Sequence, residues 1–364
     1  MLARIAFIAS IAAVGAAATS VHAAVLHVPG DSSTIQGAID IASAGDEVVV
    51  ACGTYLERLT LAADVIVRSA AGDPSCVTVD AARTGRAVFA NAADGAALHG
   101  ITFTGGLTPS HGAGLYAFET DLLVTNCVFV DHQAGNWGGG VAFQGDCSPS
   151  FEDCRFVSNE AGFGAGAYVE RGTASFVRCV FEENDAIHHG GGVDAWSPFS
   201  TPRFEECVFV RNRSLASRGG GASCNAARAY FFRCTFFENS AAEGGSALHC
   251  LQGASPLLEN CILAFGPSGE SVTCTGNSTP RIVCCDIWGN TDGDWPPCIR
   301  DQGGTRENLW LDPGFCDPAS GDLTLRGDSP CFATPCGTIG AFDVACAPVS
   351  VDALSWGQVK ARHR

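Results

Sequence analysis

The 364-residue chain lacks the residue types that mark several common protein classes. It has one methionine and one lysine, Lys360, and charged residues make up only 16% of it, against a typical share of about 25%. So little charge argues against a long solvated helix or coiled coil, and a hydrophobic share of 46% argues against disorder. Glycine is abundant, at 44 residues, but without the collagen period. We therefore expect a β protein with many tight turns.

Basic residues are scarce beside acidic ones. Lys and Arg number 21 against 38 Asp and Glu, and the net charge at pH 7 is −17. Phosphate backbones are bound by stripes of basic residues, and no such stripe runs through this sequence. We therefore expect no nucleic-acid partner and no binding to anionic membranes. Neutral sugars, cations and protein surfaces remain open as partners.

Long apolar runs are also missing, apart from one at the start. Arg4 precedes an apolar stretch over residues 5–18, and Val21-His22-Ala23 fits the small-x-small rule for signal cleavage. A membrane span needs about 20 apolar residues, and no later stretch qualifies. These features predict a signal peptide over 1–23 and an exported protein at the cell surface, in the outer envelope or outside the cell. A retained N-terminal anchor is the alternative.

Most of the 19 cysteines recur singly rather than in pairs or metal-binding clusters. Seven of them follow one another at intervals of 24 to 28 residues: Cys127, Cys154, Cys179, Cys207, Cys234, Cys261 and Cys285. A phenylalanine lies two residues after each of the first five, and strand alternation puts Cys and Phe on the same face. We predict a buried, unreactive ladder of Cys and Phe side chains inside a repeat.

Two further sequence motifs complete the repeat. An asparagine lies three residues after the Phe in four successive units, and a glycine-rich corner such as Gly190-Gly191-Gly192-Val193 follows it. The leucine pattern of leucine-rich repeats is absent, and a propeller blade needs about 40 residues. Units of about 25–27 residues with short strands and no helix predict an all-β fold, a right-handed parallel β-helix.

The ends of the predicted β-helix should be capped. Ser32-Ser33-Thr34 followed by Ile35, Ala38 and Ile39 predicts a capping helix that stops by Gly45. We place the N-terminal cap and first coil at 24–60, the β-helix at 61–290, a cysteine-containing, loop-rich cap at 291–346 and a tail at 347–364. Five cysteines outside the ladder are the expected disulfide formers, with their pairing left open: Cys298, Cys316, Cys331, Cys336 and Cys346.

The N-terminal segment from Val28-Pro29-Gly30-Asp31 to Ala38-Ile39, with Gly45-Asp46 and Gly53-Thr54-Tyr55, resembles that of pectin-lyase-like β-helix proteins. The Phe-x-x-Asn and Gly-Gly-Val/Ala motifs resemble the repeats of polymorphic outer membrane proteins, a family of bacterial adhesins. The two resemblances together cover roughly residues 24–346. They imply the β-helix fold and an adhesive role at a surface.

Alternation after the glycine-rich corners predicts an outward face that carries aromatic, acidic and amide side chains. Aromatic rings stack on sugar rings, while carboxylates and amides bind hydroxyl groups, so this face is a candidate glycan-binding surface. A covering loop or chance decoration is the alternative. The candidate ligand-binding residues are Tyr116, Phe118, Gln144, Tyr168, Glu170, Asp194, Trp196 and Asn225.

Two weaker signals concern catalysis and metal. Glu170 and Asp194 are expected on successive coils, within the separation that glycoside hydrolysis uses, although a pair of solvated acids would look the same. Asn290, Asp292 and Asp294 alternate like the start of a calcium loop, but Trp295 stands where such a loop needs glycine. No cofactor is expected, with calcium as a weak candidate.

The sequence thus supports three functional hypotheses. The first is a secreted or surface-exposed, non-catalytic β-helix protein that binds a polysaccharide, a cell-surface glycan or a surface protein. The second is a polysaccharide lyase or glycoside hydrolase that acts in a groove around Glu170 and Asp194. The third is a purely structural envelope protein.

Overall fold

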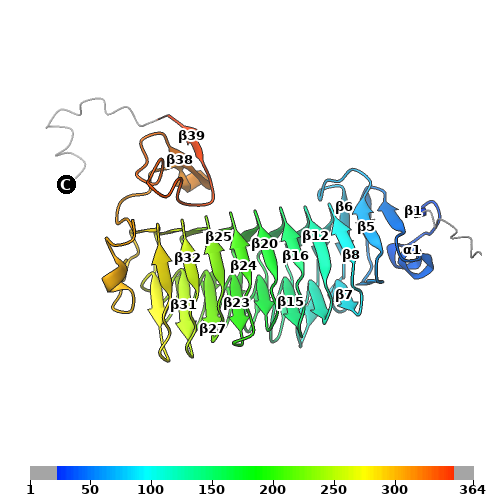
Figure 1. Ribbon diagram of the computed structural model, residues 1–364. Coiled ribbons are helices and arrows are strands. Elements are labelled where there is room, and N and C mark those ends of the chain that lie inside the picture. The colour runs from blue at the N-terminus through cyan, green and yellow to red at the C-terminus, as the bar shows by residue number, and fades with distance from the viewer. Residues whose placement is uncertain (1–22, 348–364) are drawn as a thin grey trace, which may run out of the picture.

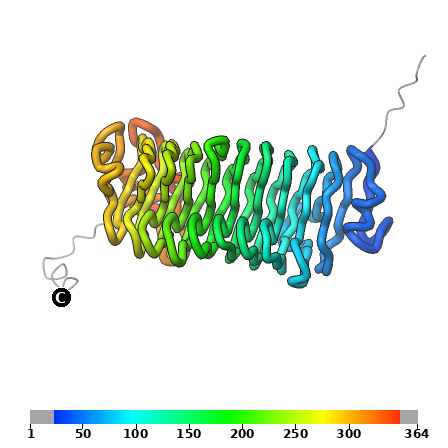
Figure 2. Tube along the Cα trace, turned by 90° about the horizontal axis from the view of Figure 1, so that it is seen from below, coloured from blue at the N-terminus to red at the C-terminus, as the bar shows by residue number. Residues whose placement is uncertain are grey.

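The computed structural model describes residues 23–347, which form an elongated rod with the capping helix at one end (Figure 1). The predicted signal peptide and tail lie almost wholly outside the described residues. Successive coils of the chain stack side by side along the rod, as the tube in Figure 2 shows. Each complete coil passes through three long parallel sheets, and the central coils add a short fourth one.

Sheet 1 has 11 parallel strands: β1 (Val25–Val28), β2 (Glu47–Val50), β5 (Ile66–Ser69), β8 (Ala96–His99), β12 (Leu122–Thr125), β16 (Ser150–Glu152), β20 (Ser175–Val177), β24 (Arg203–Glu205), β28 (Tyr230–Phe232), β32 (Leu257–Glu259) and β35 (Arg281–Val283). Sheet 2 has 10: β3 (Gly53–Tyr55), β6 (Val77–Asp80), β9 (Thr102–Thr104), β13 (Val128–Val130), β17 (Arg155–Val157), β21 (Val180–Glu182), β25 (Val208–Val210), β29 (Thr235–Phe237), β33 (Ile262–Ala264) and β36 (Asp286–Trp288).

Sheet 3 has nine parallel strands: β4 (Leu59–Thr60), β7 (Val88–Asn91), β11 (Leu115–Phe118), β15 (Val141–Gln144), β19 (Ala167–Val169), β23 (Val193–Trp196), β27 (Ala222–Asn225), β31 (Leu248–Leu251) and β34 (Val272–Cys274). Sheet 4 consists of six two-residue strands between sheets 2 and 3: β10 (Leu107–Thr108), β14 (Gln133–Ala134), β18 (Glu160–Ala161), β22 (Asp185–Ala186), β26 (Arg213–Ser214) and β30 (Ser240–Ala241).

The predicted Cys and Phe ladders form the core. On sheet 2 the ring of Phe181 stacks between those of Phe156 and Phe209, at centroid distances of 4.7 and 4.9 Å. A second column of phenylalanines on sheet 1 meets the first edge-on, as Phe176 does with Phe181. All seven ladder cysteines are buried free thiols. The prediction of an interior, non-disulfide ladder is confirmed.

Buried asparagines tie the coils together at the corner between sheets 2 and 4. The side-chain amide of Asn184 donates to Oδ1 of Asn212 (2.8 Å) and to the carbonyl of Phe156 (2.9 Å). Asn159 and Asn212 repeat this pattern, and each asparagine Oδ1 also accepts the backbone N–H of the preceding ladder residue, as Asn184 does from Asn159 (3.1 Å). The backbone polar groups of this corner are therefore satisfied without water.

The N-terminal end is capped as predicted, with one difference. Helix α1 (Ile35–Ile41) begins after Thr34, whose hydroxyl accepts the N–H of Gly37 (3.0 Å). No strand is predicted ahead of this helix. However, β1 precedes the helix and pairs with β2, because Leu26 and Val28 extend sheet 1 by one strand.

The C-terminal region closes the end of the core and covers part of sheet 2. Trp295 and Ile299, beside the short 3-10 helix η1 (Arg300–Gln302), close the open end of the core. The chain then turns back along the rod (Figure 1) and forms a three-stranded sheet over the outer face of sheet 2, where Phe315 packs against Phe237. That sheet comprises β37 (Phe315–Asp317), β38 (Asp322–Arg326) and β39 (Val344–Cys346), with the 3-10 helix η2 (Pro318–Ser320) between the first two.

Four disulfides are present, and all eight of their cysteines lie outside the ladder: Cys52–Cys76, Cys274–Cys298, Cys284–Cys336 and Cys316–Cys346. Four of the five cysteines expected to form disulfides do so. The expectation is wrong for Cys331, which is a buried free thiol that donates to Oδ2 of Asp286 (3.4 Å).

Candidate functional site

The outward face of sheet 3, where we expected the binding surface, is partly covered by the chain itself. The glycine-rich segment that leaves sheet 4 in each coil folds across this face before the next strand begins. Trp137 in one such segment stacks on Tyr168 at 5.0 Å, and His111 of the preceding coil stacks on Trp137 at 4.2 Å. The segments lie so close to the sheet that a Cβ atom at Gly190 would be 2.9 Å from Cβ of Asp194.

Because of these covering segments, three candidate residues that were expected to be exposed are buried. Tyr168, Asp194 and Asn225 are buried, at 1%, 0% and 2% exposed. Neither carboxyl oxygen of Asp194 makes a well-formed hydrogen bond within the described chain. Burial raises the pKa of Asp194 to about 7, and the hydroxyl of Ser223 on the next strand offsets only part of that rise. The Glu170/Asp194 pair therefore does not face an open groove.

The remaining candidates on sheet 3 stay at the surface but do not form a continuous strip. Phe118 and Trp196 are 38% and 39% exposed and lie three coils apart, roughly 14 Å at the strand spacing of a sheet. Between them, Gln144 accepts a hydrogen bond from the hydroxyl of Tyr116, and Glu170 is half-buried. The structure thus brings together Tyr116 and Gln144, but leaves the two exposed aromatic rings isolated.

The weak calcium candidate has another role in the structure. Asn290 occupies a position of the asparagine ladder, and its Oδ1 accepts the N–H of Gly266 (3.1 Å). Oδ1 of Asp294 accepts from the Asn290 amide and Oδ2 from the Trp310 indole, while Asp292 accepts from Gly269. Within residues 23–347, no group of three or more His, Cys, Asp or Glu side chains is arranged to hold a metal ion.

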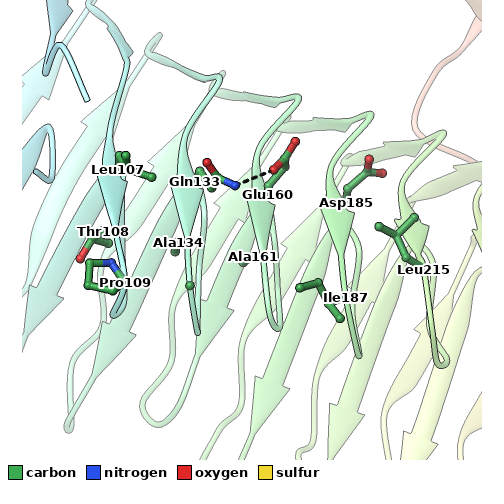
Figure 3. A pocket seen from close by; sticks show the side chains of 11 residues that line it. Leu107, Thr108, Pro109, Gln133, Ala134, Glu160, Ala161, Asp185, Ile187 and Leu215 are labelled. Carbon is green, nitrogen blue, oxygen red and sulfur yellow. Dashed lines mark hydrogen bonds between the residues drawn. The ribbon is translucent and has the colours of Figure 1, made fainter. Parts of the chain in front are cut away.

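An open groove lies elsewhere, along the outer face of sheet 4. The residue after His132, and after each buried asparagine of the corner between sheets 2 and 4, points outward. The alanine or serine that follows it points inward. One polar row therefore crosses successive strands, with Gln133, Glu160 and Asp185 in register (Figure 3). The amide of Gln133 donates to Glu160 (3.1 Å), and Arg213 holds the carboxylate of Asp185 through two bonds.

The other side of the groove is aliphatic. Pro109, Ile187 and Leu215 form the next outward row, and glycines at 135 and 162 leave a gap between Pro109 and Ile187. The floor consists of small side chains, with Ala134 and Ala161 buried beneath the gap. This hollow has a volume of about 560 Å³.

Two further hollows share Glu160 with the first, and residues of the corner between sheets 2 and 4 line them. One reaches back to Asp80 and Arg83, and the other forward to Glu238 and Phe265. Carboxylates outnumber arginines in the combined lining, so the surface is rich in hydrogen-bond acceptors and disfavours an anionic ligand. Such a long, shallow and partly apolar groove can hold an extended chain.

This groove was not predicted from the sequence, although the sequence carries a signal for it. Three buried residues of the corner, His132, Asn159 and Asn184, are each followed by a polar residue and then alanine, as in Asn159-Glu160-Ala161. Alternation from the buried asparagine would have placed the polar residue outward on every coil. The aromatic residues after the glycine-rich corners predicted the outer face of sheet 3 instead, because strand alternation does not reveal the segments that cover it.

The comparisons with known proteins agree with this architecture. Residues 86–263 match the family described as "Right handed beta helix region". The crystal structure of the pectate lyase Pel9A superposes with a TM-score of 0.55 at 13% identity, over 88% of this chain and 96% of that chain. The fold is a right-handed parallel β-helix.

A second structure with a match is the tailspike protein gp49 of Acinetobacter baumannii bacteriophage Fri1, a capsular polysaccharide depolymerase. It has a TM-score of 0.42 and 13% identity, over 75% of this chain and 58% of that one. No curated protein sequence matches the chain. Of the helices in the described part, none is long and apolar enough to cross a membrane.

Proposed function

We propose that this protein binds an extended, uncharged polysaccharide without cleaving it, and that the strand lies in the groove along sheet 4. The observation that carries the proposal is the row formed by Gln133, Glu160 and Asp185, which runs along the rod beside an aliphatic row. A polymer laid parallel to the rod axis would meet a new polar group at each coil.

The chemistry of the groove suits a hydroxylated ligand. Carboxylates accept hydrogen bonds from hydroxyl groups, and an amide can both donate and accept. Sugar-binding sites combine such polar groups with apolar contact, and the alanine floor and aliphatic row supply the apolar part. The acidic lining and the net charge of −17 disfavour anionic polymers.

One structural neighbour, the repeat motifs and the cysteines support a role outside the cytoplasm. The pectate lyase that shares the fold is named for a polysaccharide, and the repeat motifs resemble those of surface adhesins. Four disulfides suit an oxidising compartment, in keeping with export to the cell surface or beyond.

We propose binding rather than catalysis because neither acidic pair is suited to cleavage. Asp194 is closed off from solvent, so Glu170 lacks an accessible partner. In the groove, the carboxylates of Glu160 and Asp185 already accept hydrogen bonds from Gln133 and Arg213. Hydrolysis needs a carboxyl group that is free to act as the acid on the glycosidic oxygen.

A polysaccharide panel tests the proposal. We expect the wild-type chain to be retained on at least one neutral polysaccharide, and the double variant Gln133→Ala/Glu160→Ala to bind it at least about tenfold more weakly, since two hydrogen-bonding groups are lost. The matched control is Glu205→Ala, which removes a half-buried carboxylate from sheet 1. Retention on no polysaccharide, or unchanged binding by the double variant, would overturn the proposal. Release of reducing ends or unsaturated products by the wild type, lost in Glu170→Gln, would establish an enzyme instead.

A further inference from the structure

We infer that the groove along sheet 4 selects sugars that carry methyl groups, as O-acetyl esters or as 6-deoxy sugars. This inference rests on the proposed function, because it names the class of polysaccharide that the same groove would hold. It follows from the aliphatic side chains of the groove and from their placement beside the gap in the aliphatic row.

Large aliphatic side chains gather in this groove and are exposed there. Leu107, Ile187 and Leu215 are 37%, 51% and 52% exposed, and all three line the same hollow together with Pro109. Clustered exposed apolar side chains usually mark a surface that makes contacts. A side chain exposed only by chance would not be repeated on successive coils, as Ile187 and Leu215 are.

These side chains are the wrong shape for stacking on a sugar ring. No aromatic residue lines this hollow, whereas flat rings are what usually covers the apolar face of a sugar. Branched aliphatic groups instead surround small apolar groups such as methyls. A ligand that buries a methyl here gains apolar contact that an unsubstituted hydroxylated sugar cannot provide.

The gap in the aliphatic row is formed by two glycines. Pro109 and Ile187 lie three coils apart in the same row, and Gly135 and Gly162 occupy the two positions between them. Neither glycine leaves room for a side chain, since an added Cβ would be 2.6 Å from the carbonyl oxygen of Pro109 and 2.7 Å from that of Asn136 respectively. The gap is therefore fixed by the backbone and stays open above Ala134 and Ala161.

The opposite row restricts what else the ligand can carry. Glu160 and Asp185 present carboxylate oxygens, which accept from hydroxyl groups and repel uronates and sulfates. The groove therefore fits a polysaccharide with an uncharged, hydroxylated backbone, whose methyl-bearing substituents point toward Ile187 and Leu215. Acetyl esters and deoxy sugars share this chemistry.

Pairs of polymers that differ only in the methyl-bearing group distinguish selectivity for that group from binding of the polysaccharide in general. The probes are acetylated xylan before and after mild alkaline removal of its acetyl groups, and fucosylated xyloglucan before and after removal of its fucose. We expect removal of the methyl-bearing group to weaken binding of the wild type by roughly tenfold or more in at least one pair, which also tells the ester from the deoxy source.

Two variants tie the effect to the aliphatic row. Ile187→Ser and Leu215→Ser should abolish the difference within a pair while still binding the stripped polymer, and both should fold because the side chains are exposed. Leu123→Ser, at a residue 44% exposed on sheet 1, should keep the preference. Equal wild-type affinity for both members of each pair overturns the inference and leaves the proposed function standing. Failure to bind any polymer of the wider panel overturns the proposed function itself.

Discussion

The carboxyl group of Asp194 shows how a covering segment changes the chemistry of one residue. It sits on β23 among side chains that strand alternation directs outward, yet the glycine-rich segments over sheet 3 exclude water from it. Ser223 on one side and Tyr168 on the other are its neighbours along the row. With no well-formed hydrogen bond to stabilise the charge, the protonated form is favoured.

This environment predicts a pH-dependent stability. The pKa of Asp194 in the folded chain is about 7, above its ordinary value of 3.8, so the folded state holds the proton more tightly than the unfolded chain does. The stabilisation is complete below the ordinary value and is lost as the pH rises through 7. Between pH 5 and pH 8, we expect the free energy of unfolding of the wild type to fall by roughly 2–3 kcal/mol more than that of Asp194→Asn.

Denaturant unfolding of both proteins at the two pH values measures this difference. Asp286, whose pKa burial raises to about 6, contributes in the same direction in both proteins and cancels in the comparison. The same pH dependence in the wild type and in Asp194→Asn would show that Asp194 is not protonated in the folded chain.

At the scale of the structural element, the asparagine ladder replaces solvent at the corner between sheets 2 and 4. Asn184 uses all of its side-chain hydrogen-bonding capacity: it donates to Phe156 and Asn212, and it accepts twice from Asn159. Asn184→Ala would leave several buried groups without partners, each worth about 1–3 kcal/mol.

We therefore expect Asn184→Ala to lower the free energy of unfolding by about 3 kcal/mol or more. Asn136→Ala is the matched control, because that side chain is only half-buried and makes no hydrogen bond in the described structure, and a change within about 0.5 kcal/mol is expected. Chemical denaturation measures both. A loss for Asn184→Ala no larger than that of the control would contradict a structural ladder.

The elements that could be predicted are those with a strict period. The Cys-x-Phe motif of Cys179 and Phe181 recurs in five successive units, so alternation alone placed both side chains inside, and Thr34 marked the start of the capping helix. What could not be predicted depends on contacts between different coils or distant segments. Nothing local specifies that Trp137 covers Tyr168, or that Phe315 returns to pack on Phe237 at 5.6 Å.

The candidate site illustrates the same limit. The exposed positions of Phe118 and Trp196 follow from alternation, but the burial of Asp194 follows from glycine segments that lie flat on the sheet. The polar row of the groove could have been predicted from the sequence, because its residues directly follow His132, Asn159 and Asn184. Its depth was not, because it depends on how the backbone at Gly135 and Gly162 approaches the neighbouring coils.

At the scale of the whole molecule, the stacking of coils gives the protein a surface with its own repeat. Each coil advances the rod by one strand spacing, about 4.8 Å, so equivalent side chains form rows parallel to the rod axis. The row on sheet 4 varies in chemistry from Gln133 to Arg213 while its spacing stays constant. A surface of this kind is suited to a polymer, whose units also recur along one axis.

The crystal structure of the chain with a retained polysaccharide tests this central claim most directly. The account predicts a strand that lies along the rod axis over β14, β18 and β22, with hydroxyl groups within hydrogen-bond distance of Glu160 and Asp185. A polysaccharide bound instead to the outer face of sheet 3, between Phe118 and Trp196, would contradict the assignment of the groove.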